Sequence, residues 1–245
     1  MNQEKYNKIF SLFILFGMAA ALALATAFKW GSNSSENILL LVSVFGSLMG
    51  ACSGIFSANG RIVTFLFGLL DVSIYGIMCF MNWNSGGSGL GTAILHMVYF
   101  VPMQFIGFFQ WRKRGADSKS AVKARRLSSR QWLFFTVLFV CGAIFSYFLL
   151  AHFDKSDSTQ LIKMAVVLDV IPLMCNIIGQ LLMSTAYLEQ WIFWIGVNVF
   201  SILMWTKSFY DGQSSFAGIY IVKYFFYLTN CIHGLRLWIK MSKQN

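Results

Sequence analysis

The sequence predicts an all-α integral membrane protein with eight transmembrane helices, and three observations predict this class. Hydrophobic residues make up 57% of the 245 residues and charged residues only 11%, against about 25% charged residues in an ordinary soluble domain. Eight apolar stretches each approach the ~20 residues that a helix needs to cross about 30 Å of hydrocarbon. The chain also matches itself when it is shifted by 127 residues. The composition therefore gives the class, and the self-match gives the internal organisation.

The expected helices follow the apolar stretches in order along the chain. Continuous helices are expected because lipid offers no partner for free backbone groups. The first stretch follows Lys5 and Lys8 and is long for a signal peptide, so an uncleaved helix is favoured over cleavage after Ala25. The eight expected spans are 9–28, 36–57, 61–81, 90–111, 131–151, 161–184, 188–207 and 215–239.

Basic residues give the expected orientation of the spans. The segment 112–130 carries eight Lys and Arg residues against one acid, Asp117. The positive-inside rule therefore places this segment in the cytoplasm. Four spans precede it and four follow, so both termini are expected in the cytoplasm as well. The net charge of +10 is accounted for by this topology and by an anionic lipid surface, and nucleic acid is not an expected partner.

The self-match predicts two copies of a three-helix unit. The shift pairs Asp71 with Asn198, Gly107 with Gly234 and Trp111 with Trp238. One helix between the copies restores the orientation, so the repeats are expected to be parallel, with a site on the axis between them. This axis would lie between the third, fourth, seventh and eighth spans. The expected units are an extra N-terminal helix (1–30), a first repeat (36–113), a basic loop with a linker helix (114–160) and a second repeat (161–240).

Paired polar residues in these apolar spans are the first candidates for a binding site. A carboxylate inside a membrane is costly, so Asp71 is a functional-site hypothesis by default, against a structural hydrogen bond as the alternative. Asn198 follows Trp194 by four residues and Trp191 by seven, which puts the three side chains on one helical face. Trp194 lies too deep for an interfacial anchor, so we expect a stacking platform beside an amide. Packing within the bundle is the alternative.

The first copy repeats this pattern of an aromatic and a polar residue, and the last helix of each copy adds further polar candidates. Phe67, Asp71 and Tyr75 follow one another at spacings of four residues, so the site is expected to be asymmetric, with stacking weighted to the second copy. Gln104, Tyr227 and Asn230 are further candidates, each equally explained by hydrogen bonds between helices. The three histidines lie at different depths, and no CxxC spacing occurs, so no metal or cofactor is expected.

These candidates suggest a flat, polar and cationic ligand. A tryptophan face attracts cations, more so in a desolvated site. Asp71 would supply a counter-charge, and the amides would hydrogen-bond hydroxyl or carboxamide groups.

The motif Trp191-x-x-Trp194-x-x-x-Asn198, together with Gln104 and the three-one-three repeat, resembles the PnuC family of bacterial nicotinamide riboside transporters over nearly the whole chain. The resemblance implies a relative of the SWEET fold in the bacterial inner membrane and facilitated diffusion of nicotinamide riboside. It also implies trapping by a separate cytoplasmic kinase, and a homotrimer. Nicotinamide riboside has the pyridinium, carboxamide and ribose hydroxyls that such a site would hold.

Three alternatives remain open at this point. A transporter of another vitamin or nucleoside fits the same stacking residues, and Asp71 could carry a proton in an ion-coupled transporter. An intramembrane protease with Ser88 of Gly86-Gly87-Ser88-Gly89 as nucleophile is remote, because no histidine base is expected within its reach. An ATP-driven pump is not indicated, since the sequence has no GxxxxGK[ST] loop.

Overall fold

All the regular secondary structure in the described part of the chain is helical. The computed structural model describes residues 3–32, 34–84, 90–153, 164–210 and 217–243, and no β-strand occurs in them. The helices are α1 (Gln3–Lys29), α2 (Ser34–Ala58), α3 (Thr64–Asn84), α4 (Leu90–Leu95), the π-helix η1 (His96–Phe100), α5 (Val101–Lys113), α6 (Ser129–Phe153), α7 (Met164–Ser184), α8 (Gln190–Tyr210) and α9 (Ala217–Met241).

The helix lengths confirm a multi-pass membrane protein. Within the described residues, five helices are long and apolar enough to cross a membrane. They contain Lys5–Phe28, Asn37–Ala58, Thr64–Met81, Ala93–Lys113 and Ser129–His152. The helices α8 and α9 have 21 and 25 residues, which are comparable lengths. The expected starts of the sixth and eighth spans, at 161 and 215, lie outside the described residues.

The fourth span is not the continuous α-helix that the sequence analysis expected. It consists of α4, the π-turn η1 and α5, and the Val101 N–H donates to the His96 carbonyl across five residues. The cause is Pro102, one residue into α5. A proline ring clashes with the carbonyl four residues earlier, which is that of Val98 inside η1. The wider π-turn accommodates this clash.

Two further spans start later than expected, because each follows a turn with a left-handed residue. The third starts at Thr64 rather than 61, after Gly60 at φ 66°, and α8 starts at Gln190 rather than 188, after Ala186 at φ 61°. Asp71 consequently lies seven residues into α3. At ~1.5 Å per residue it is about 11 Å from the start of that helix and about 5 Å short of its midpoint.

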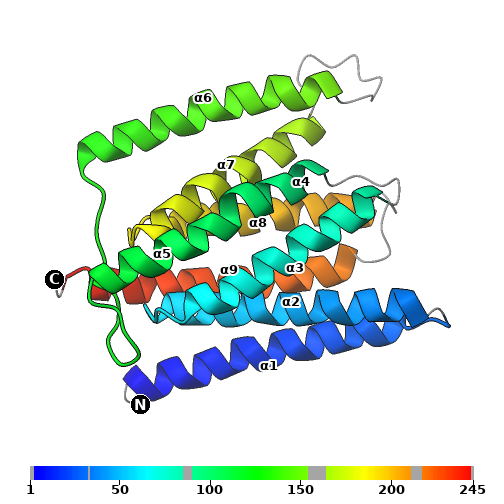
Figure 1. Cartoon of the computed structure of the whole chain (residues 1–245), viewed down its shortest axis with the longest axis horizontal. Helices are drawn as coiled ribbons and strands as arrows, with labels where there is room; N and C mark the ends of the chain where they lie inside the picture. The colour runs from blue at the N-terminus through cyan, green and yellow to red at the C-terminus, as the bar shows by residue number, and fades with distance from the viewer. Residues whose placement is uncertain (1–2, 33, 85–89, 154–163, 211–216, 244–245) are drawn as a thin grey trace.

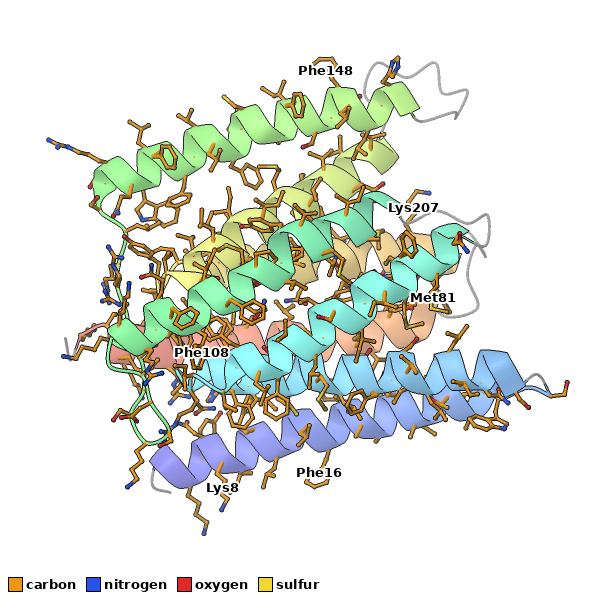
Figure 2. All side chains as sticks on the ribbon, in the orientation of Figure 1. Lys8, Phe16, Met81, Phe108, Phe148 and Lys207 are labelled. Carbon is orange, nitrogen blue, oxygen red and sulfur yellow. The ribbon has the colours of Figure 1, made fainter. Side chains whose placement is uncertain are left out.

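The helices lie roughly side by side, with α1 along one side of the bundle and α6 along the other (Figure 1). Here α1 packs on α2 and α9, and α6 packs on α7. Both termini and the connection from α5 to α6 lie at the same end (Figure 1), which we call the basic end. Phe16 of α1 and Phe148 of α6 point away from the bundle (Figure 2) and are 67% and 68% exposed, as suits a surface that faces lipid.

Close approach of two helices depends on glycine at equivalent places in the two expected repeats. A Cβ on Gly107 of α5 would lie 2.2 Å from the Phe65 ring of α3. A Cβ on Gly234 of α9 would lie 2.6 Å from the Trp191 ring of α8. In each case an aromatic ring near the start of one helix lies close to the backbone of another. Gly107 and Gly234 are the residues that the shift of 127 pairs.

We expect Gly234→Ala to destabilise the folded protein by about 1–3 kcal/mol, because the buried Trp191 ring has to move to admit the methyl group. The matched control is Gly142→Ala, where a Cβ would meet only the flexible end of Met174. Thermal unfolding in detergent checks this, and Gly234→Ala should lower the midpoint clearly more than Gly142→Ala. Equal midpoints would mean that Trp191 can move at no cost.

Candidate functional site

Four polar side chains lie at middle height in the bundle, and we call them the polar layer: Asp71, Gln104, Asn198 and Asn230. The three amides are only 3%, 4% and 6% exposed, respectively, and Asp71 is partly buried. They lie seven to eleven residues from the basic end of their helices, which is roughly 10–17 Å along the helix axis. Polar groups this deeply buried in an apolar bundle are expected to be hydrogen-bonded or to serve function.

Three of these side chains lie close to one strip of small residues on α2, which consists of Gly50, Ser53 and Gly54. A Cβ on Gly50 would lie 2.8 Å from a carboxylate oxygen of Asp71, and one on Gly54 would lie 3.0 Å from the amide nitrogen of Asn230. Gln104 lies close by, since a Cβ on Gly68 of α3 would be 2.5 Å from its Oε1 and 3.1 Å from the Ser53 hydroxyl of the strip. The sequence analysis placed the axis between the third, fourth, seventh and eighth spans. The structure adds α2, whose small residues leave room for the polar groups.

The tryptophan and amide of α8 face α7 and α9. The Asn198 amide donates to the Trp194 carbonyl at 2.7 Å and to the Cys231 sulfur at 3.4 Å. The indole of Trp194 lies against α7, because a Cβ on Gly179 would be 3.4 Å from its ring atoms. Both side chains are therefore directed into the bundle, with Trp194 partly buried and Asn198 buried. Asn230 and Cys231 are neighbours in α9, so this group adjoins the strip of α2.

Several buried polar atoms, in the polar layer and towards the basic end, have no hydrogen-bond partner. They include Oε1 of Gln104, both amide atoms of Gln190 and Nε1 of Trp191. An unpaired buried donor or acceptor typically costs about 1–3 kcal/mol. The Gln104 side chain donates only a long bond of 3.4 Å to the Phe100 carbonyl. Its free acceptor is therefore a group that a bound carboxamide or hydroxyl could satisfy.

A lysine of the same chain lies near Asp71. Lys223 of α9 lies near enough to interact electrostatically with this carboxylate. The Lys223 ammonium is 5.5 Å from the centre of the Tyr227 ring and 6.0 Å from that of Tyr224. The Tyr227 hydroxyl donates to the Ser47 carbonyl of α2, one turn before Gly50. The acid, the lysine and the two tyrosines therefore form one group on the side of the polar layer away from the basic end.

The remaining predicted residues pack elsewhere. Trp191 is 2% exposed and lies with Trp238, at 6.2 Å between ring centres, in the apolar cluster towards the basic end. Phe67 stacks on Phe56 of α2 at 5.2 Å. Tyr75 is 50% exposed and lies against His96 at 4.9 Å. The rings that these three side chains contact thus lie outside the polar layer.

Comparisons with known proteins show the family of the chain. Residues 40–240 match the family model described as nicotinamide mononucleotide transporter. The nicotinamide riboside transporter PnuC of Neisseria mucosa is 31% identical over 81% of this chain and 72% of its own length. The PnuC of Haemophilus influenzae is 26% identical over 83% of this chain and 81% of its own. The chain belongs to the PnuC family.

A solved PnuC structure extends the comparison to three dimensions. The crystal structure of the vitamin B3 transporter PnuC matches with a TM-score of 0.71 and 27% identity, and the match covers 100% of this chain and 94% of the other. The family model starts after α1, at residue 40, so the first helix is outside the family match. PnuC proteins are transporters, and the chain is accordingly not assigned as an enzyme.

The remaining features are the nucleophile of the protease hypothesis, a possible metal site and two residues that were not predicted. Ser88 of the protease hypothesis lies outside the described residues. No group of three or more His, Cys, Asp or Glu side chains that could hold a metal occurs in the described part of this PnuC protein. Cys231 was missed as a neighbour of the site, and Gln190 was missed as a buried polar residue. The shift of 127 pairs Cys231 with Gln104 and could have indicated it, whereas the burial of Gln190 has no signal in the sequence.

Proposed function

We propose that this chain carries nicotinamide riboside across the membrane by facilitated diffusion, with alternating access to a site at the polar layer. The observation that carries the proposal is Gln104, whose acceptor is buried and unpaired in the same layer as Asn198. The names of the relatives supply the substrate class. The polar layer supplies groups of the right chemistry.

Each part of nicotinamide riboside has a counterpart among these residues. The indole of Trp194 would stack on or flank the pyridinium ring, since aromatic faces attract desolvated cations. Gln104, Asn198 and Asn230 would hydrogen-bond the carboxamide and the ribose hydroxyls. Asp71 would balance the positive charge. We propose supporting roles for Trp191, Phe67, Tyr75 and Tyr227, which shape the surroundings of the layer.

The helix contacts support two parallel three-helix repeats within eight spans. The first repeat would be α2, α3 and the broken helix α4–η1–α5, and the second α7, α8 and α9. Here α2 packs on α9, and α7 packs on α5. The first helix of each repeat therefore packs on the last helix of the other repeat. Two such halves, related by an axis along the membrane normal, can rock about a site between them.

We further propose that the basic end faces the cytoplasm of a bacterial cell, with the chain in the inner membrane. The basic segment 112–130 and both termini lie at this one end (Figure 1), as the positive-inside rule requires. A homotrimer, which the family resemblance implied, stays a prediction. The exposed apolar face of α6, with residues such as Phe134 and Phe145, is available to lipid or to another copy.

The phosphorylated form, nicotinamide mononucleotide, is the second candidate substrate, because the family model carries its name. Phosphate binders usually use arginine, and the polar layer holds an acid and three amides. We therefore expect nicotinamide riboside to raise the thermal unfolding midpoint of the purified protein, while the mononucleotide, thiamine, riboflavin and uncharged nucleosides raise it less. A larger shift with any of those compounds would reassign the substrate.

Uptake into vesicles tests the mechanism separately from the substrate. In proteoliposomes without any kinase, internal nicotinamide riboside should rise until it equals the external concentration. A proton ionophore should leave the rate unchanged, because no gradient drives a facilitator. Accumulation above the external concentration would instead support an ion-coupled transporter with Asp71 as the proton carrier.

A further inference from the structure

Three tryptophans close the basic end of the bundle below the polar layer, and we call them the tryptophan cluster: Trp111, Trp191 and Trp238. They are 0%, 2% and 0% exposed, respectively. The ring centres of Trp111 and Trp238 are 5.5 Å apart, and those of Trp191 and Trp238 are 6.2 Å apart. Trp238 follows Cys231 by seven residues in α9, which is about 10 Å along the helix. The cluster therefore lies between the polar layer and the basic end.

Two indoles of the cluster hydrogen-bond across the two halves. Trp111 of α5 donates to the Met183 carbonyl of α7 at 2.7 Å. Trp238 of α9 donates to the Ser57 carbonyl of α2 at 2.9 Å. The two tryptophans are paired by the shift of 127, and each one reaches into the half to which it does not belong. Together these two bonds hold the halves against each other at this end.

The segment between α5 and α6, residues 114–128, covers the cluster, and we call it the strap. Ala116, Val122 and Ala124 of the strap are 2%, 2% and 5% exposed and belong to the same apolar cluster as the tryptophans. The exposed tip of the strap is closed by Asp117, whose carboxylate accepts the Lys119 and Ser120 N–H groups at 2.7 and 2.6 Å. These two donors lower the pKa of Asp117, so its carboxylate is charged at neutral pH.

Backbone hydrogen bonds fix the strap to both halves. The Val122 N–H donates to the Gly60 carbonyl at 2.9 Å, in the turn between α2 and α3. The Arg125 N–H donates to the Ala186 carbonyl at 2.8 Å, in the turn between α7 and α8, and the Arg125 carbonyl accepts from Leu188 at 2.9 Å. The Arg125 guanidinium also lies 4.3 Å from the centre of the Tyr187 ring. The strap thus joins the two turns that carry left-handed residues.

We propose that the tryptophan cluster and the strap together form the cytoplasmic gate of the transporter, closed in this structure. Opening separates Trp111 from α7 and Trp238 from α2, and it releases the strap from the turn between α2 and α3, where one backbone hydrogen bond holds it against two at the other turn. Both sets of contacts join the halves that alternating access has to move apart. The inference rests on the proposed transport function and orientation, but the first test below needs no substrate.

Cys231 provides a native reporter of gate opening. It is 7% exposed, accepts a hydrogen bond from Asn198 and packs in the same cluster as Trp238. The other four cysteines are replaced by alanine, and a membrane-impermeant maleimide is applied from the basic end in inside-out vesicles. Trp111→Phe and Trp238→Phe keep a ring but lose the N–H donor. Each should raise the labelling rate about fivefold, which corresponds to about 1 kcal/mol of gate stability.

Trp132→Phe on α6 is the matched control, because Trp132 is exposed outside the cluster at the same end of the bundle. It should leave the labelling rate unchanged. Unchanged labelling in both cluster variants, or faster labelling only from the opposite face in right-side-out vesicles, would overturn the gate.

A cross-link tests the strap independently of the tryptophans. A Cβ on Gly60 would lie 3.2 Å from that of Ala121, close to the ~3.8 Å of a disulfide. In a chain without native cysteines, oxidised Gly60→Cys/Ala121→Cys should bind nicotinamide riboside within about twofold of the reduced form. Its uptake rate should fall by about tenfold or more, and reductant should restore it.

The Gly60→Cys single variant carries the same backbone strain without the cross-link, and its uptake should not respond to oxidation. Full uptake by the oxidised double variant would overturn the gate. Loss of ligand binding in both redox states would instead argue against the proposed substrate.

Discussion

Replacing Trp194 by alanine is expected to weaken nicotinamide riboside binding by at least about thirtyfold. A cation against an indole in a desolvated site is worth about 2 kcal/mol or more, which is about thirtyfold in affinity, and the lost apolar contact adds to this. Trp194→Phe keeps a smaller aromatic face and should lose less. Titration calorimetry on the purified variants measures both affinities.

Two comparisons separate this expected loss from a loss of folding. Trp132→Ala removes an exposed indole from α6 and should leave the affinity unchanged. The unfolding midpoint of each variant without ligand reports the stability directly. A folded Trp194→Ala protein with unchanged affinity would contradict the assignment of the stacking platform, although the membership of the PnuC family would stand.

Replacing Asp71 by asparagine is expected to weaken binding of the cationic riboside by about tenfold, and that of its neutral reduced form by much less. A charge interaction of about 1.4 kcal/mol accounts for a factor of ten. The loss is enlarged because the variant leaves the Lys223 side chain near the site without the Asp71 carboxylate. The double variant Asp71→Asn/Lys223→Gln should therefore regain much of the affinity for the cation.

The same change at an exposed acid provides the control for Asp71. Asp169 of α7 is exposed, and Asp169→Asn should leave both affinities unchanged. If Asp71→Asn weakened the cationic and the neutral ligand equally, the carboxylate would have a structural role against α2 rather than an electrostatic one. A coupling close to zero between Asp71 and Lys223 in the double-variant cycle would support the same conclusion.

Pairings along the chain could be predicted because they depend on periodicity alone. The shift of 127 brought together Trp111 with Trp238 and Gly107 with Gly234, and the structure gives each pair equivalent contacts. The spacing of Trp194 and Asn198 likewise put both on one face of α8, where the structure has them. Helical geometry fixes which residues share a face without any knowledge of the neighbouring helices.

Contacts between residues of different helices could not be predicted in the same way. Pro102 is visible in the sequence, but only the contacts of the fourth span show that it is accommodated by a π-turn rather than by a break. Ser53 and Gly54 look like ordinary small residues of an apolar helix. Their position against Gln104 and Asn230 depends on how α2 is rotated, which packing decides.

The sequence by itself determined the membrane class, the family and the polar residues available for a site, and it predicted the repeat, because apolar length and periodicity are properties of the chain. Only the tertiary structure decided that α2 forms one side of the polar layer, that Trp191 belongs to the closed end, and that the strap bonds to both turns. Such contacts join residues far apart in sequence, and they arise from the fit of whole helix surfaces, which no local pattern encodes.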